Sequence, residues 1–276
     1  MGHSLHCVAP TRAQAPQCSV SELAQRRGAR GGAARQDWAN GLALLDAIVD
    51  NAAMVVQFRG VLPANSLAAL RSTVQAAIAG SPAEPAQGFR VLASEHPAAR
   101  QLAPALLSTV RDHPELERTL YPAGLSFPSF YLYCGSTSSA LQVARPLAGT
   151  DPTLRVDLSV LLWLSEKSAY AGGEVLIDEG GALTRWAGEP GDALAYPAGA
   201  RWGIQPITRG ELLLCMLEVQ SRVPGELERR ILLDFQRTRA EFERRPPCAR
   251  HAQTMRRVCD ELLRLWAEVP RRGSHP

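Results

Sequence analysis

The chain has 276 residues, of which 46% are hydrophobic, and a formal net charge of +3. This length is enough for one large folded domain or a domain with additions. A nucleic-acid-binding protein usually carries a stronger and more clustered basic signal. No apolar run reaches the roughly 18–20 residues that a membrane-spanning helix needs. We therefore expect a globular protein that binds neither nucleic acid nor a membrane.

The six cysteines are spread along the chain without tight pairing, which favours free thiols in a reducing compartment. Residues 1–36 are rich in Arg and nearly free of acids, but they lack the apolar segment of a secretory signal. Their composition favours a disordered tail, or a start codon assigned too early, over a transit peptide. Lys167 is the only lysine beside 29 arginines, which suggests a GC-rich bacterial genome. We expect a cytoplasmic protein.

Helical periodicity dominates the chain up to Pro122. Apolar residues recur at helical spacing from Trp38 to Ala53, and a strand is expected at 54–58. Pro63 opens a helix that runs to about Ala79, with Leu67, Leu70, Val74 and Ile78 on one face. A loop at 80–88 and helices at about 97–111 and 114–120 follow.

Strand signals separated by Gly and Pro turns dominate the next hundred residues. Strands are expected at 127–133, 154–165, 174–177, 183–186, 193–196, 202–206 and 211–220. Two helices, 227–243 and 250–269, close the chain. This order predicts an α+β protein with a barrel or jelly-roll core. The expected division is a tail at 1–36, a helical part at 37–122, a β core at 123–222 and C-terminal helices at 223–276.

Five short motifs follow one another through the strand region and the last helix. They are Arg155-Val-Asp-Leu-Ser159 with Leu162-Trp-Leu-Ser165, Tyr170-Ala-Gly-Gly-Glu174, Gly191-Asp-Ala-Leu-Ala-Tyr-Pro197, Pro206-Ile-Thr-Arg-Gly210 with Gln220-Ser221, and Asp260-Glu-Leu-Leu-Arg-Leu-Trp-Ala-Glu268. With these motifs the chain resembles the bacterial PKHD-type hydroxylases, relatives of prolyl 4-hydroxylase, over about residues 54–269. The resemblance implies a double-stranded β-helix, a jelly-roll or cupin-like barrel with flanking helices. It also implies Fe(II) and 2-oxoglutarate as the family's cofactors.

The resemblance implies an iron site made of an H-x-D pair and a distal His, with an Arg for 2-oxoglutarate. In this chain the H-x-D positions hold Gln142 and Ala144, and the distal position holds Trp202. The 2-oxoglutarate position holds Leu212. No histidine occurs between His113 and His251, so no shift of the alignment restores two imidazoles. The sequence therefore predicts vestigial positions, no catalytic or metal-binding residues there, and no bound cofactor.

These losses predict a non-catalytic oxygenase-like protein, a pseudoenzyme with a binding and regulatory role. Trp202 and Leu212 would place apolar groups where iron and its co-substrate sit in the family. We accordingly expect a protein partner or a small apolar ligand. The resemblance also suggests a homodimer. Two alternatives stay open: an active hydroxylase with a non-standard or subunit-shared site, since the scaffold motifs are kept, and a metal scavenger that uses His3, His6, Cys7 and Cys18.

A few other polar residues invite a functional reading. Asp157 and Glu174 are interpreted as structural, because an isolated carboxylate makes a poor transition-metal site. Glu218 is expected to pair with Arg155 or Arg201, because a buried unpaired carboxylate is costly. The group of Cys248, His251 and Cys259 is interpreted as part of a packed helix, since zinc modules use other spacings. The helix around residues 229–245 alternates Arg with acids, as solvated helix faces do.

Overall fold

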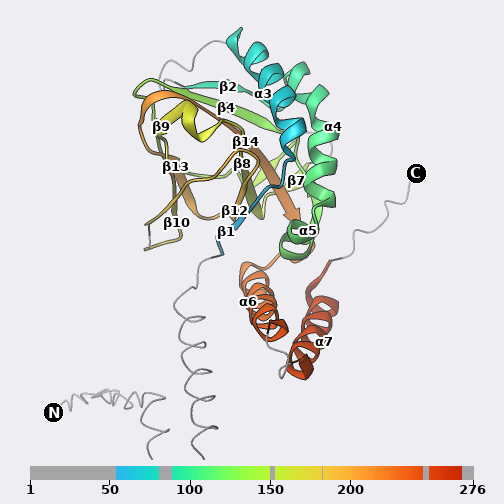
Figure 1. Cartoon of the computed structure of the whole chain (residues 1–276). Helices are drawn as coiled ribbons and strands as arrows, with labels where there is room; N and C mark the ends of the chain where they lie inside the picture. Colours follow the sequence, from blue (N-terminus) through green and yellow to red (C-terminus); the bar gives the residue numbers. More distant parts are fainter. Residues whose placement is uncertain (1–53, 81–88, 150–152, 182, 245–248, 269–276) are drawn as a thin grey trace, which may run out of the picture. The chain divides into compact units, whose positions relative to one another are not determined.

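The computed structural model describes residues 54–80, 89–149, 153–181, 183–244 and 249–268 (Figure 1). All of them belong to one compact unit, Ala52–Pro276. The predicted helix at 38–53 and nearly all of the predicted loop at 80–88 lie outside the described residues.

The core consists of two antiparallel sheets (Figure 1). The path through the larger sheet is β1 (Val56–Phe58), β12 (Ala193–Pro197), β8 (Leu158–Trp163), β14 (Ile207–Ser221), β4 (Ser129–Cys134) and β2 (Arg90–Leu92). The smaller sheet has the order β11 (Leu183–Trp186), β10 (Val175–Asp178), β13 (Arg201–Ile204) and β5 (Ser139–Val143). Short strands β3 (Pro122–Leu125) and β9 (Tyr170–Gly172) pair with β14, and β6 (Leu147–Ala148) pairs with β7 (Leu154–Arg155).

From β4 onward the chain crosses repeatedly between the two sheets. The strands β4, β8, β12 and β14 enter the larger sheet, while β5, β10, β11 and β13 enter the smaller one. This alternation is the winding of a double-stranded β-helix, or jelly roll, so the predicted fold class is confirmed.

The alternation of side chains along β14 separates two apolar layers. Leu213, Cys215, Leu217 and Val219 join the cluster beneath the N-terminal helices. Leu212, Leu214 and Met216 join a second cluster that also contains residues of the smaller sheet, such as Trp202 and Ile177. The even-numbered residues of β14 therefore face the space between the two sheets.

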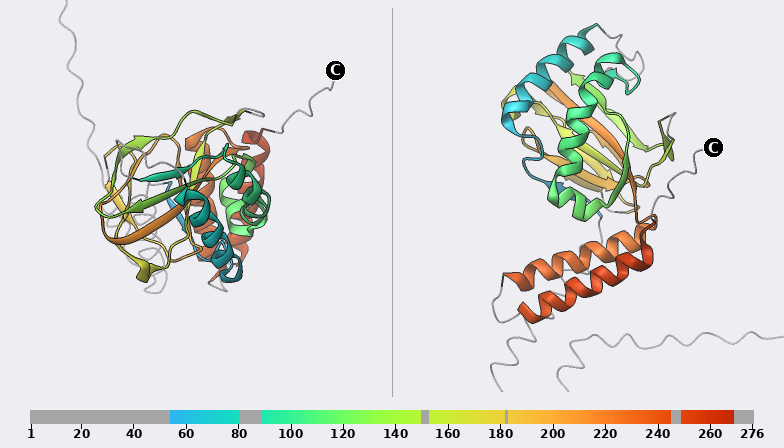
Figure 2. Two further views of the ribbon diagram at one scale, coloured as in Figure 1. Left: turned by 90° about the horizontal axis from the view of Figure 1, so that it is seen from above. Right: turned by 90° about the vertical axis from the view of Figure 1, so that its right-hand side faces the viewer.

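Helices α3 (Ala64–Ala79), α4 (Pro97–Asp112) and α5 (Pro114–Leu120) lie over one face of the larger sheet (Figures 1 and 2). The predicted apolar face of α3 is correct, because Leu67, Val74 and Ile78 are buried and Leu70 packs against the same cluster. His96 and His113 cap α4 and α5, since their Nδ1 atoms accept hydrogen bonds from Ala98 N at 3.2 Å and Leu116 N at 3.4 Å. These two imidazoles therefore accept hydrogen bonds at helix N-termini and do not contribute to the barrel.

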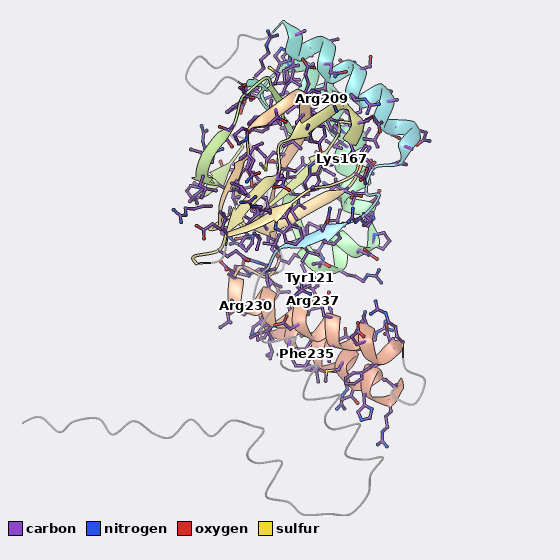
Figure 3. All side chains as sticks on the ribbon, turned by 60° about the vertical axis from the view of Figure 1, so that its left-hand side comes forward. Tyr121, Lys167, Arg209, Arg230, Phe235 and Arg237 are labelled. Carbon is purple, nitrogen blue, oxygen red and sulfur yellow. The ribbon has the colours of Figure 1, made fainter. Side chains whose placement is uncertain are left out.

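The C-terminal helices α6 (Glu226–Glu243) and α7 (Ala249–Trp266) pack side by side as a hairpin (Figure 2). The buried Arg229 joins α6 to the barrel, because its guanidinium donates to the carbonyls of Val223, Pro224 and Asp157. Farther along α6, the Gln236 amide donates to the hydroxyl of Tyr121, which lies at the end of α5 beside this helix (Figure 3). No helix among the described residues is long and apolar enough to cross a membrane.

The single strand predicted at 154–165 is wrong, because Val156 and Asp157 interrupt it between β7 and β8, and β8 ends at Trp163. There the backbone N–H of Val156 donates to the Pro146 carbonyl, and that of Asp157 donates to the Val219 carbonyl. These bonds replace the continuous strand ladder that the prediction required.

Candidate functional site at the mouth of the barrel

The structure brings three of the four vestigial positions together. Gln142 on β5 and Trp202 on β13 are Cα partners in the antiparallel ladder. Directly opposed residues of neighbouring strands place their side chains on the same face, about 5 Å apart. Ala144 comes just after the end of β5. This end of the barrel, which we call the mouth, therefore has the geometry in which two or three side chains could reach a common ion.

The chemistry of these side chains does not fit the family's cofactors. An amide, a methyl group and an indole stand where Fe(II) needs imidazole nitrogens and a carboxylate oxygen. Leu212 lies deeper, opposite Tyr133 on β4, and offers no charge for the distal carboxylate of 2-oxoglutarate. These four side chains support no chemical step through iron.

The apolar replacements fill the space between the sheets. Trp202 is 5% exposed and Leu212 is 0% exposed, and both belong to one packed cluster. The Trp202 ring meets the ring of Tyr131 edge-on, with 6.3 Å between the ring centroids. The expectation of an open apolar cleft lined by these two residues therefore finds no support in their packing.

A carboxyl group shares the mouth with these residues. Glu218 on β14 faces Ser159 on β8, and Ser159 in turn faces Tyr196 on β12. The Ser159 hydroxyl donates to Oε2 of Glu218 at 2.6 Å. The Tyr196 hydroxyl donates to the sulfur of Met216 at 3.5 Å. Glu218, Ser159 and Tyr196 thus form a polar row across three strands at the end of the barrel that also carries Trp202.

The predicted arginine partner of Glu218 is wrong. Arg155 instead binds Asp157, with 2.8 Å between Nε and Oδ1, and Arg201 pairs with Asp178 on β10. Glu218 faces inward, away from both arginines, because it has the same parity along β14 as Met216 in the inner cluster.

Burial dominates the electrostatics of this row. It raises the pKa of Glu218 to about 7, although the hydrogen bond from Ser159 acts in the opposite direction. Burial also raises the pKa of Tyr131 to about 12, with a further rise from the charge of Glu218 and a lowering by Arg145. The pKa of Tyr196 lies well above its ordinary value, through burial first and then Glu218. The charge of Glu218 thus raises the pKa of both tyrosines.

Sequence reasoning did not identify this row, although a signal for it was present. Glu218 is the one charged residue in the apolar stretch Leu212–Val219, and its position is even-numbered like Leu212, Leu214 and Met216. Assigning the inward face to that parity would have placed Glu218 inside the barrel and predicted a hydroxyl or another polar partner.

The other polar residues singled out in the sequence have structural contacts. The Asp157 carboxyl accepts from Arg155 and from the backbone N–H of Ser221, and Glu174 lies 3.7 Å from Arg185. These contacts agree with the structural interpretation of both carboxylates. The described residues contain no group of three His, Cys, Asp or Glu side chains placed to hold a metal ion.

The predicted cysteine and histidine groups are only partly described. Cys259 is buried, and the His251 ring packs against Phe242 at 5.6 Å between centroids. Cys248 lies outside the described residues, as do His3, His6, Cys7 and Cys18.

Comparison with curated proteins identifies relatives of the whole barrel. A PKHD-type hydroxylase of Burkholderia lata is 29% identical over 230 residues, which cover 78% of this chain and 100% of the relative. A PKHD-type hydroxylase of Paraburkholderia xenovorans gives the same identity and coverage. No family model matches the chain.

Solved structures give weaker likenesses. A Pseudomonas putida prolyl-4-hydroxylase has a TM-score of 0.44 at 19% identity, covering 64% of this chain and 98% of that one. A Burkholderia pseudomallei oxidoreductase of the 2OG-Fe(II) oxygenase family has a TM-score of 0.46 at 17% identity, covering 72% and 94%. HygX from Streptomyces hygroscopicus, with nickel and 2-oxoglutarate bound, has a TM-score of 0.45 at 14% identity, covering 63% and 85%.

These findings correct the prediction that no cofactor is involved. The curated relatives of this chain are named PKHD-type hydroxylases, and that family uses Fe(II) and 2-oxoglutarate. The prediction that no cofactor is involved conflicts with these relatives and is not kept. The residues at the four positions nevertheless remain a poor match for those cofactors.

Proposed function

We propose that this chain, a homologue of the bacterial PKHD-type hydroxylases, uses an oxygenase-like barrel to bind a ligand or a protein partner, with a regulatory role, and does not hydroxylate a substrate through the family's iron site. The observation that carries the proposal is the pairing of Gln142 with Trp202. These are the two positions at which the resemblance places the iron-binding histidines, and neither side chain supplies an imidazole.

The chemistry of the facial triad supports this proposal. Fe(II) oxygenases need three protein ligands and three open positions on one ion. An indole ring does not replace an imidazole as a ligand, and the methyl group of Ala144 supplies no donor atom. His96 and His113, the histidines of the described chain that precede the barrel strands, cap helices.

A second candidate is an active hydroxylase with a non-standard or subunit-shared site. The intact scaffold favours it. The turn at Gly172–Gly173 packs on the turn before β14, where Gly172 pairs with Ile207 and Gly173 N donates to the Pro206 carbonyl at 3.3 Å. A barrel that keeps these turns keeps the frame on which the family builds its chemistry. Glu218 at the mouth is the carboxylate that such a site would use.

We also propose a cellular compartment and a protein partner for this chain. Cys134, Cys215 and Cys259 are free thiols, which suits a reducing compartment such as the cytoplasm. We include a second copy of the chain among the candidate protein partners.

Conversion of 2-oxoglutarate to succinate tests the proposal. The purified chain is incubated with Fe(II), ascorbate, oxygen and 2-oxoglutarate, and succinate is compared with a sample in which a chelator removes iron. The proposal predicts equal succinate in both samples. Iron-dependent succinate that rises in proportion to the protein would overturn it and support the second candidate.

A further inference from the structure

We propose that the outer edge of β5 (Ser139–Val143) pairs antiparallel with β5 of a second copy of this chain, about a two-fold axis at Leu141. This inference rests on the proposed function and deepens it, because it names the partner and the surface that binds it. The pairing joins the smaller sheets of two protomers into one continuous sheet.

The first support is the position of β5 at the end of a sheet. The smaller sheet has the order β11-β10-β13-β5, and β13 is the one strand that pairs with β5 in the described part of the chain. In an antiparallel ladder alternate residues direct their N–H and C=O groups to opposite sides of the strand. The side of β5 away from β13 therefore presents a row of backbone groups that can pair with another strand.

The second support is that β5 lacks the features that usually prevent such pairing. Proteins protect sheet edges with charged side chains, with proline or with very short strands. The other edge strands of the two sheets follow this rule: β2 carries Arg90, β11 carries Arg185, and β1 has only three residues. In contrast, β5 has five residues, none of them charged and none a proline. Among the described edges, this one opposes pairing least.

The third support is the apolar character of the exposed face. No residue of β5 is buried, and Val143 is 54% exposed. Gln142 shares a face with its ladder partner Trp202, which packs inside the barrel. Because side chains alternate along a strand, Leu141 and Val143 lie on the outer face of the sheet. A strand added at this edge would place its own side chains beside them and shield them from water.

The sequence of β5 matches a second copy of itself as that strand. In antiparallel pairing about Leu141, this residue lies opposite the partner's Leu141, and Val143 lies opposite the partner's Ser139. The two leucines meet on the axis with a valine on either side, which gives a continuous apolar strip across the junction. The same patch thus serves both protomers, as a two-fold interface requires.

The charges around β5 also permit self-pairing. Residues 129–144 contain no charged side chain, and Arg145 is the first one after the strand. In the proposed register Arg145 lies opposite the partner's Thr137. The two copies of Arg145 are then about eight residues apart along the strands, or roughly 27 Å, so that like charges do not meet.

The interface is small, and the dimer should accordingly be weak. Five residue pairs form about four to six backbone hydrogen bonds. Contacts of this size are typical of transient complexes, so we expect a Kd on the order of 100 μM.

Sedimentation equilibrium of the full chain, with a reducing agent present, tests the inference. The average mass should rise from that of a monomer toward that of a dimer, with a midpoint on the order of 100 μM. A chain that stays monomeric up to about 1 mM would overturn the inference.

Opposite charges placed on the two-fold axis test the register. Leu141→Lys and Leu141→Glu each bring two like charges face to face, and each variant alone should associate at least ~10-fold more weakly than the unsubstituted chain. An equimolar mixture of the two variants places Lys opposite Glu and should recover association to within about 3-fold of the unsubstituted chain. A mixture that associates no better than either variant alone would overturn the pairing at Leu141.

Leu183→Lys is the matched control, because Leu183 is an exposed leucine on β11, at the opposite edge of the same sheet. It should leave association unchanged, and an equal loss in this variant would contradict a role specific to β5. Urea unfolding verifies that each variant is folded. The succinate measurement separates the two levels of the account. Iron-dependent succinate overturns the proposed function, whereas a monomeric chain without such succinate overturns only this inference.

Discussion

Replacement of Glu218 by Gln should change how stability depends on pH. In the folded protein the Glu218 pKa lies at about 7, against an ordinary value of 4.5. The folded chain therefore holds this proton more tightly than the unfolded chain. Its contribution to the free energy of unfolding is fully present below pH 4.5 and is lost as the pH rises through 7. At about 1.4 kcal/mol for each factor of ten, the loss amounts to roughly 3 kcal/mol.

Urea unfolding at several pH values between 4.5 and 8.5 measures this effect. Gln keeps an oxygen that accepts the hydrogen bond from Ser159 but does not ionise. Subtracting the curve of Glu218→Gln from that of the unsubstituted chain cancels the other titrating groups. The free energies of unfolding of the unsubstituted chain and of Glu218→Gln should agree near pH 4.5. At pH 8.5 Glu218→Gln should be more stable by up to roughly 3 kcal/mol. Parallel stability curves at all pH values would refute a buried Glu218 carboxyl with a raised pKa. Glu211→Gln, at an exposed position of the same strand, is the control.

Three further substitutions, one of them with a matched control, test other parts of the structure by urea unfolding. Gly210→Ala should lower the free energy of unfolding by at least roughly 3 kcal/mol, because φ is +74° and the new Cβ would meet the Ala169 carbonyl. Its control is Gly180→Ala, at a φ of +90° but with open space around the new Cβ, which should lower it by about 1 kcal/mol. Equal costs would contradict this reading of the turn. Arg229→Met should cost about 3 kcal/mol, since three carbonyls lose a charged donor; a neutral result would mean that the hairpin is held otherwise. Leu212→Ala should cost roughly 2–5 kcal/mol through a cavity, whereas a lining residue of an open cleft would cost much less.

The sequence indicated the elements whose signals are local. The apolar period of Leu67, Val74 and Ile78 after Pro63 is a helix signal that needs no tertiary information, and α3 has the expected bounds within a residue. In contrast, β5 is short and has no buried residue. Its existence depends on pairing with β13, about sixty residues later, and no local pattern shows such a partner.

The same distinction applies to the site. The motifs identified Gln142 and Trp202 as counterparts of two iron-ligand positions, but their pairing in the ladder between β5 and β13 was not visible in the sequence. The surroundings of Glu218 did not follow, because they depend on which face of β14 points inward and on the neighbours that β8 and β12 supply. The expected partners Arg155 and Arg201 are instead occupied by nearer carboxylates.

Oxygen consumption by a chain with the four positions restored tests the central claim most directly. The variant carries Gln142→His, Ala144→Asp, Trp202→His and Leu212→Arg, and it is compared with the unsubstituted chain in the presence of Fe(II) and 2-oxoglutarate. If these side chains are what separate the barrel from a hydroxylase, iron-dependent oxygen uptake should appear in the restored chain and exceed that of the unsubstituted one. Iron-dependent uptake in the unsubstituted chain equal to that of the restored chain would show that catalysis uses other residues and would contradict the account.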